Sequence, residues 1–263
     1  MGKPATRLYV AEDLAAGAVV GVDHQQAHYL RSVLRLARGA AIALFNGRDG
    51  EWLAELEGLG KGWASLAVQR RIRAQSESPD VWLVFAPIKR ARIDFLAEKA
   101  TELGCRRLLP VMTRFTAVDR VNVERLRANA REAAEQCERL DVPLVEPPQT
   151  LAKLLEAWPV NRRLFVCSER EAAPPLGDAL AETTDPQPAA VMTGPEGGFA
   201  ESELATMARL PFVTRVGLGP RILRSDTAAL AALAVWQSVR GDGSARPPSP
   251  ASAQGTSEPD LAD

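Results

Sequence analysis

Two glycine-rich segments near the C-terminus carry residue types suited to holding a small ligand. The first spans residues 193–198 (TGPEGG), and the second spans residues 217–227 (GLGPRILRSDT). Each follows a strand-like apolar run and precedes a helix-like one. Ligands of α/β sheets bind at the carboxyl ends of the strands, and clustered glycines let the backbone approach a ligand closely. We therefore expect both segments to lie on one rim of a sheet and to share one binding site.

The residue types of these segments indicate which class of ligand fits. Neither GxxxxGK[ST] nor GxGxxG occurs in them, so the common phosphate-binding loops are excluded. Glu196 also places a carboxylate in the first segment, where it would repel a phosphate. A neutral or cationic ligand held by backbone groups fits better, and S-adenosylmethionine, a sulfonium without phosphate, is one. A glycine-rich turn without a ligand is the alternative for residues 193–198 taken by themselves.

The second segment adds charged groups beside the last predicted helix. Arg221 and Arg224 lie three residues apart and are followed by Asp226. The helix macrodipole disfavours cations at a helix N-terminus, so their position there indicates use in binding or chemistry. Ser225 or Asp226 is also expected to cap this helix.

The elements around these segments belong to a folded protein of ordinary composition. The 263 residues are 46% hydrophobic and 25% charged, as in globular proteins. No apolar run approaches the ~18 residues that a membrane span needs, and the first residues lack a hydrophobic secretory core. The three cysteines are widely spaced, which fits a reducing compartment. We expect a cytoplasmic protein.

The order of strand-like and helix-like patterns predicts two domains followed by a tail. Short strand-like runs with turns fill residues 1–75, interrupted by one helix pattern at 25–36, and predict a small β-rich, barrel-like domain. Strands and helices then alternate from residue 81 to about 240, which predicts an α/β domain with a mostly parallel sheet. Residues 241–263 are rich in Pro, Ser, Gly and Ala and are expected to be disordered. The predicted strands are 7–10, 41–47, 51–56, 65–72, 81–86, 107–112, 163–167, 189–194 and 212–218. The predicted helices of the second domain are 90–103, 122–140, a short one after Thr150, 176–181, 201–209 and 226–239.

Charge is distributed unevenly along the chain. Residues 61–125 contain 13 basic and 7 acidic residues, whereas residues 241–263 contain one basic and four acidic ones. A basic block of this kind permits a polyanionic partner such as RNA. A solvated arginine-rich surface is the alternative, which composition by itself slightly favours.

Several segments together resemble one family. GPEGG (194–198) and LGPRILRSDTA (218–228), with HYLRSVLRLARGA (28–40), KATELGCRRLLPVMTRFT (99–116) and EQCERLDVP (135–143) in matching order, resemble the bacterial 16S rRNA uracil-N3 methyltransferases of the SPOUT superfamily. The resemblance covers about residues 5–240. One departure is visible: the family usually has Arg-Thr-Glu-Thr-Ala where this chain has Arg-Ser-Asp-Thr-Ala (224–228), so the acid is one methylene shorter.

The resemblance implies a fold and a function. The implied fold is α/β: a C-terminal SPOUT-type domain with a parallel sheet and a trefoil knot (residues 76–240), preceded by a small β-rich PUA-like barrel domain that binds RNA (1–75), with the tail at 241–263. The implied activity is S-adenosyl-L-methionine-dependent methylation of N3 of a uridine in 16S rRNA. The implied partners are 16S rRNA or the small ribosomal subunit and a second copy of the chain, as a homodimer.

Two further patterns in the sequence concern the dimer and metal binding. The last helix pattern is apolar all round from Ala228 to Trp236 and must be covered on more than one side; the domain itself could cover it, but the resemblance favours a dimer interface nearby. Two histidines four residues apart, His24 and His28, lack a third ligand, so no metal site is expected.

The residue types and the resemblance together assign roles to individual residues. The expected catalytic residues are Arg224 and Asp226. The expected cofactor-binding residues are Thr193, Gly194, Pro195, Glu196, Gly197, Gly198, Leu218, Gly219, Ile222, Leu223 and Thr227. The expected RNA-binding residues are Arg31, Arg35, Lys89, Arg90, Arg92 and Arg114.

Two other functions remain open on the sequence. A knotted enzyme could methylate the ribose 2′-oxygen instead of the base. The chain could also be an RNA-binding ribosome assembly factor with an inactive cofactor pocket, for which the shortened acid at Asp226 is the only support.

Overall fold

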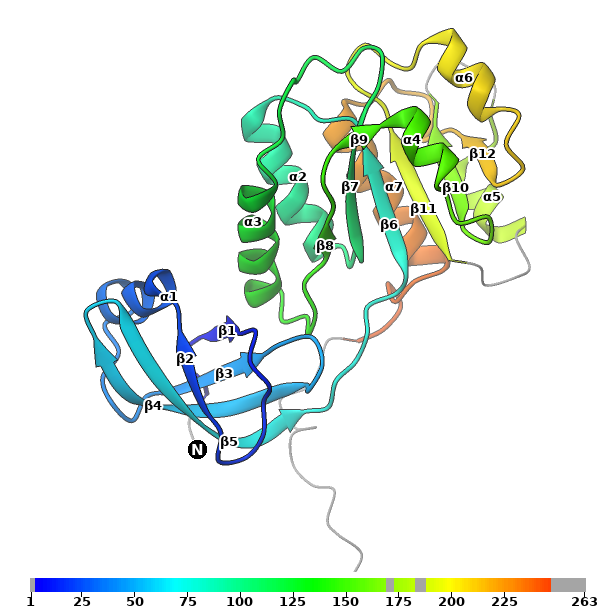
Figure 1. Cartoon of the computed structure of the whole chain (residues 1–263). Helices are drawn as coiled ribbons and strands as arrows, with labels where there is room; N and C mark the ends of the chain where they lie inside the picture. The colour runs from blue at the N-terminus through cyan, green and yellow to red at the C-terminus, as the bar shows by residue number, and fades with distance from the viewer. Residues whose placement is uncertain (1–2, 169–172, 183–187, 247–263) are drawn as a thin grey trace, which may run out of the picture. The chain divides into compact units, whose positions relative to one another are not determined.

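The computed structural model describes residues 3–168, 173–182 and 188–246, which form two compact units. The first unit ends at Ser76 and the second spans Glu77–Gly243 (Figure 1). The predicted disordered tail lies mostly outside the described residues. Within the described residues, no helix is both long enough and apolar enough to cross a bilayer.

The N-terminal unit is a five-stranded sheet in the order β1-β3-β4-β5-β2. Strand β1 pairs with β3 in parallel, and the other neighbours are antiparallel. Leu8 and Leu66 alternate with more exposed residues and are almost completely buried, because one face of the sheet carries the core. Strand β3 is buried on both faces from Ile42 to Phe45. The strands are β1 (Arg7–Tyr9), β2 (Val19–Val22), β3 (Ala41–Phe45), β4 (Glu51–Gly60) and β5 (Trp63–Arg73).

The helix predicted at 25–36 differs from what the structure contains. It consists of a short α-helix, α1 (His24–His28), followed by one π-helical turn, η1 (Tyr29–Val33). Asp23 caps α1, with its carboxylate accepting from the Gln26 amide. The chain turns away at Arg35, which has φ of +53°. The apolar spacing that predicted a longer helix does place Leu30 in the core. Strand β2 was not predicted, because its four residues include a glycine that weakens a strand pattern.

The C-terminal unit contains a seven-stranded sheet in which every pairing is parallel. The order is β12-β10-β11-β6-β7-β8, with β9 also paired to β7. This confirms the predicted α/β domain with a parallel sheet. The strands are β6 (Val81–Phe85), β7 (Arg107–Met112), β8 (Leu144–Val145), β9 (Gln149–Thr150), β10 (Arg163–Cys167), β11 (Ala189–Thr193) and β12 (Val213–Val216).

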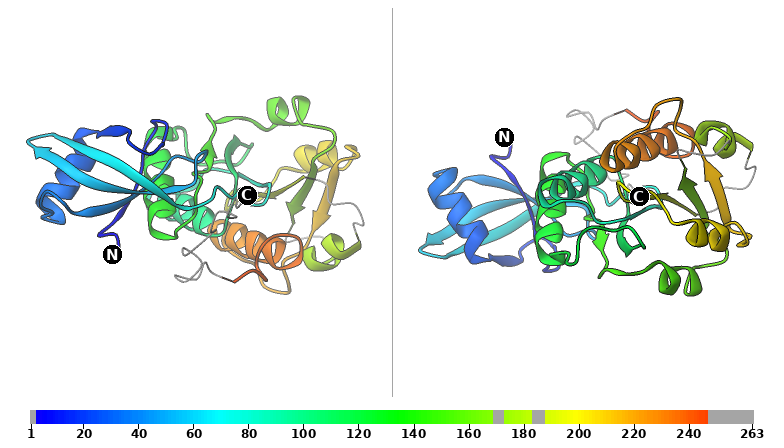
Figure 2. Two further views of the ribbon diagram at one scale, coloured as in Figure 1. Left: turned by 90° about the horizontal axis from the view of Figure 1, so that it is seen from below. Right: turned by 90° about the horizontal axis from the view of Figure 1, so that it is seen from above.

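Helices cover both faces of this sheet (Figures 1 and 2). Val191 of β11 faces a core shared with α2, α3, α5 and α7, whereas Ala190 and Met192 face a second core formed with α4 and α6. Strands that bury both faces are apolar throughout, which explains why AAVMT has no polar alternation. The helices are α2 (Arg90–Glu102), α3 (Val123–Gln136), α4 (Leu151–Glu156), α5 (Leu176–Glu182), α6 (Glu201–Met207) and α7 (Ser225–Val239).

The predicted helices of this unit are confirmed, with corrections at their ends. Asn122 caps α3 and Thr150 caps α4 through their side-chain oxygens. Helix α3 stops at Gln136 instead of about residue 140, and Cys137, the residue that follows it, is exposed. On α7, Ala232 is completely buried within its own unit, so the domain itself covers part of this apolar helix.

Candidate functional site

A cavity of about 340 Å³ lies at the carboxyl edge of the parallel sheet. The loop after β11 and the loop after β12 both line it, as expected for segments that follow parallel strands of one sheet. Strand β10 lies between β11 and β12, and its end completes the wall. The lining residues are Cys167, Ser168, Thr193, Gly194, Pro195, Glu196, Gly197, Gly198, Phe199, Leu204, Leu218, Gly219, Arg221, Ile222, Leu223, Arg224, Ser225 and Ala228.

Most of the residues expected to bind a cofactor or to act on substrate border this cavity. All the expected cofactor-binding residues line it except Thr227, which is exposed on the first turn of α7. Arg224 lines it as well, whereas Asp226 does not. The sequence therefore located the segments that form the cavity, and Thr227 is the expected cofactor-binding residue that does not line it.

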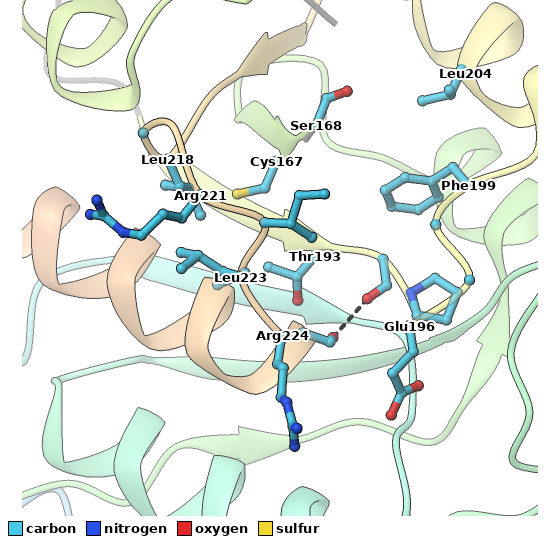
Figure 3. A pocket seen from close by; sticks show the side chains of 18 residues that line it. Cys167, Ser168, Thr193, Glu196, Phe199, Leu204, Leu218, Arg221, Leu223 and Arg224 are labelled. Atoms are coloured by element: carbon cyan, nitrogen blue, oxygen red, sulfur yellow. Dashed lines mark hydrogen bonds between the residues drawn. The ribbon is translucent and has the colours of Figure 1, made fainter. Parts of the chain in front are cut away.

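The cavity wall contains one buried polar group without a partner. Thr193 is 1% exposed, and its hydroxyl has no hydrogen-bond partner among the described residues. Cys167, Leu218 and Leu223 lie around it, whereas the side chains of Arg221 and Arg224 extend away from this group (Figure 3). An unpaired buried hydroxyl costs about 1–3 kcal/mol. Thr193 therefore fits a wall that hydrogen-bonds a ligand.

The start of α7 is attached directly to the first glycine-rich loop. The Ser225 hydroxyl donates a 2.7 Å hydrogen bond to the Gly194 carbonyl (Figure 3). Arg224 occupies the N-cap position, with no side-chain capping bond. The expectation that Ser225 or Asp226 caps the helix is therefore wrong, because Ser225 is helical and uses its hydroxyl to join the two loops.

Arg92 of α2 connects the same two segments electrostatically. Its guanidinium lies 3.6 Å from Glu196 of the first loop and 3.3 Å from Asp226 of α7. Arg92 was expected to contact RNA, and Asp226 was expected to be catalytic together with Arg224. The structure instead shows Asp226 paired with Arg92. Sequence spacing could not show this, because Arg92 is more than a hundred residues from both acids.

This ion pairing also changes the argument about ligand charge. Glu196 was expected to repel phosphate, but its carboxylate is paired with Arg92. The lining includes two arginines, Arg221 and Arg224, beside that one carboxylate. The charge of the lining therefore does not exclude an anionic group, and the case against phosphate rests on the missing phosphate-loop motifs.

The glycines of the two loops serve different purposes. Gly198 and Gly219 have φ of +74° and +98°, which side chains rarely adopt. Gly197 has ordinary φ, but a Cβ there would lie 3.2 Å from Cβ of Phe115. Gly197 therefore makes room for Phe115, and not only for a ligand as the sequence suggested.

Sequence reasoning missed part of the wall. Cys167 and Ser168 follow β10, so the rule that located the other two loops would also have found them. Burial raises the pKa of the Cys167 thiol to about 12, so the thiol stays protonated at neutral pH and acts as an apolar surface. The other lining residues not predicted to bind are Phe199, Leu204, Ser225 and Ala228.

The expected RNA-binding residues divide between the two units. Arg31 and Arg35 are exposed on η1 and just after it in the first unit. Lys89 and Arg114 are exposed in the second unit. Arg90 is the first residue of α2. The basic excess of residues 61–125 is partly neutralised, because arginines such as Arg106 and Arg107 pair with glutamates.

Two protein-family models match this chain. The RNA methyltransferase domain family matches residues 76–237, and the RNA methyltransferase PUA domain family matches residues 22–67. The chain belongs to this RNA methyltransferase family. Two family members are named ribosomal RNA small subunit methyltransferase E. The one from Rickettsia conorii is 32% identical over 87% of this chain and 93% of its own. The one from Synechocystis is 35% identical over 88% of this chain and 76% of the Synechocystis chain.

Solved structures of the family agree with the fold. A ribosomal RNA small subunit methyltransferase E from Neisseria gonorrhoeae, bound to S-adenosyl methionine, has a TM-score of 0.81 and 30% identity over 90% of this chain and 98% of its own. A putative methyltransferase from Legionella pneumophila in complex with the same cofactor has a TM-score of 0.80 and 26% identity over 92% and 100%. This chain has an N-terminal PUA domain before an α/β domain with a parallel sheet.

The residues of the cavity fit S-adenosylmethionine. The cavity volume lies within the ~300–1,000 Å³ of small-molecule sites. Its wall offers backbone groups at five glycine or proline positions of the two loops, namely Gly194, Pro195, Gly197, Gly198 and Gly219. The unpaired hydroxyl of Thr193 supplies a side-chain hydrogen-bonding group.

Proposed function

We propose that this chain transfers a methyl group from S-adenosylmethionine to N3 of a uridine in small-subunit ribosomal RNA. The observation that carries the proposal is the cavity formed by the loops after β11 and β12, with the unpaired Thr193 hydroxyl in its wall. Membership of the RNA methyltransferase family and the S-adenosyl methionine-bound relative support the cofactor. The choice of uracil N3 rests on the sequence resemblance.

The reaction requires that uracil lose its N3 proton and that the resulting anion be held in line with the methyl group. S-adenosylmethionine, when bound, supplies an electrophilic methyl group on its sulfonium sulfur. Asp226 is the proposed acceptor of the N3 proton, and Arg224 is the proposed partner of the uracil anion. The N3–carbon bond forms as the carbon–sulfur bond breaks, and S-adenosylhomocysteine and methylated RNA leave. The residues expected to bind the cofactor, except Thr227, keep that role in this proposal.

RNA binding is proposed for the first unit, residues 1–75, and for basic side chains within residues 76–240. Arg31 and Arg35 of the first unit, with Lys89, Arg90 and Arg114 of the second, contact phosphates in this proposal. Phosphate contacts orient the RNA without reading its sequence.

A homodimer and a trefoil knot complete the proposal. Ile222, which borders the cavity, is 76% exposed, so a large apolar side chain lies open beside the site. Ala234 is exposed on α7, in contrast to Ala232. Ala234→Glu should therefore give monomers in light scattering while the fold is kept. A wild-type protein that is monomeric and fully active at micromolar concentration would refute the dimer.

The test of the proposed function is mass spectrometry of 16S rRNA from cells that lack this protein. One methylated uridine should be missing, with the methyl group on the base, and the wild-type gene should restore it. Asp226→Asn and Arg224→Gln should not restore it. A methyl group lost from a ribose would instead support the 2′-oxygen reaction, and unchanged rRNA would refute the proposal.

A further inference from the structure

A half-exposed phenylalanine stands beside the loop that borders the cavity. Phe115 follows β7 and is 50% exposed. Its Cβ and Cγ lie 3.2 and 3.8 Å from the point where a Cβ on Gly197 would lie, and Gly197 lines the cavity. The ring is therefore separated from the cavity by a single backbone segment, and half of its surface is open.

The turn that carries Phe115 is held in place by hydrogen bonds on both sides. The Thr116 hydroxyl accepts from the Thr113 amide at 2.9 Å, and the two threonine hydroxyls are also 2.9 Å apart. The Arg114 amide donates to Glu203 of α6 at 2.8 Å. The other oxygen of Glu203 accepts from the Ala200 amide at 2.9 Å. The backbone that carries the exposed ring is thus tied to the start of α6.

We propose that Phe115 is a stacking platform for the target uracil. This inference rests on the proposed function. An enzyme that alters a base must take it out of the stack, and the exposed base then needs a new flat partner. Phe115 offers an exposed aromatic face beside the loop that lines the cavity, and Arg114, the neighbouring residue, offers an exposed cation for the adjoining phosphate. The mechanism described above gives neither residue a role at the base.

Another exposed phenylalanine provides a matched control. Phe95 lies on α2 and is 45% exposed, with the Lys99 ammonium 5.8 Å from its ring centre. Neither phenylalanine lines the cavity itself, but Phe115 lies against the lining residue Gly197. Phe95 and Phe115 therefore have nearly equal exposure and differ in their relation to the site.

The experiment measures methylation of small subunits from cells that lack the protein, using radiolabelled S-adenosylmethionine. Phe115→Leu keeps an apolar side chain but removes the aromatic face, and it should lower kcat/KM for the subunit by about tenfold, within the range for loss of one base stack. Phe115→Tyr should retain activity, and Phe95→Leu should match the wild type. S-adenosylhomocysteine affinity, measured by calorimetry, should be unchanged in all three variants.

Each outcome decides the inference. Wild-type activity in Phe115→Leu, or an equal loss in Phe115→Tyr, overturns it. Weaker S-adenosylhomocysteine binding or an altered oligomeric state in Phe115→Leu also overturns it, because the ring would then support the cavity or cover a second copy. Failure of the proposed function would look different, since wild-type protein itself would leave the subunits unmethylated. In that case, photo-crosslinking to 5-iodouridine-substituted 16S rRNA tests the platform directly: a crosslink at Phe115 supports it and its absence overturns it.

Discussion

Replacing Arg92 with glutamine tests whether the contact between α2, the first glycine-rich loop and α7 holds the cavity together. The variant removes the cation that lies between Glu196 and Asp226 and leaves both carboxylates in place. Asp226 is the more buried of the two, with a side chain that is 13% exposed, whereas that of Glu196 is 44% exposed. The larger part of the effect should therefore come from Asp226.

The size of the effect follows from the distances and the exposure. Opposite charges 3.3 Å apart attract by ~5 kcal/mol at an effective dielectric constant of about 20. Water and side-chain ordering reduce fully exposed pairs to about 0.2–1 kcal/mol, and Arg92 is 28% exposed. For the Arg92–Asp226 pair we take a net stabilisation of ~1.4 kcal/mol, which lies between the value for a fully exposed pair and the unreduced attraction. If it holds the binding-competent loop arrangement, S-adenosylhomocysteine affinity should fall by up to about tenfold.

Calorimetry with S-adenosylhomocysteine checks this, with Arg92→Lys as the conservative variant that should recover most of the affinity. Arg125→Gln is the matched control, because it breaks a 2.6 Å pair with Asp94 that does not border the cavity. Thermal unfolding confirms that each variant is folded. Unchanged affinity in Arg92→Gln, or an equal loss in Arg125→Gln, would refute the reasoning. If Arg92→Gln instead weakens RNA binding and leaves cofactor binding unchanged, Arg92 contacts RNA, as the sequence predicted.

Three further predictions concern other parts of the protein. Ser225→Ala removes the hydrogen bond to the Gly194 carbonyl and should weaken S-adenosylhomocysteine binding about three- to tenfold in calorimetry, since such a bond contributes ~0.5–1.5 kcal/mol; equal affinity would show that this link does not shape the cavity. Thr193→Val replaces a buried hydroxyl that has no partner, so the ligand-free protein should melt at a higher temperature while S-adenosylhomocysteine binds more weakly; a lower melting temperature would contradict the assignment. Arg31→Gln combined with Arg35→Asn, in which asparagine tolerates the positive φ at that position, should weaken RNA binding and flatten its salt dependence without changing cofactor affinity; an unchanged salt slope would exclude phosphate contacts there.

The sequence by itself determined the order of elements and the position of the cavity. The central strands β6 and β11 are almost entirely apolar, with the sequences VWLVF and AAVMT, because a strand buried on both faces needs no polar alternation. Glycine-rich segments after the strands now seen as β11 and β12 predicted a site at the carboxyl edge. Both inferences depend on patterns within short segments, and such patterns are visible in the sequence without knowledge of the fold.

Short or irregular elements were less predictable. Strand β2 has four residues, and β8 and β9 have two each, too few to show a period. The π-helical turn at Tyr29–Val33 preserves an apolar spacing similar to that of an α-helix, so the sequence pattern does not distinguish the two.

Only the tertiary structure decided which groups meet. Arg92 joins Glu196 to Asp226, Ser225 donates to Gly194, and Gly197 accommodates Phe115. These partners are far apart in the chain, and each contact depends on how α2, β7 and α7 pack around the sheet. A residue type and its spacing indicate what chemistry is available, but hydrogen bonds and ion pairs act over a few ångströms, so the partner of a charge is fixed only when the chain has folded.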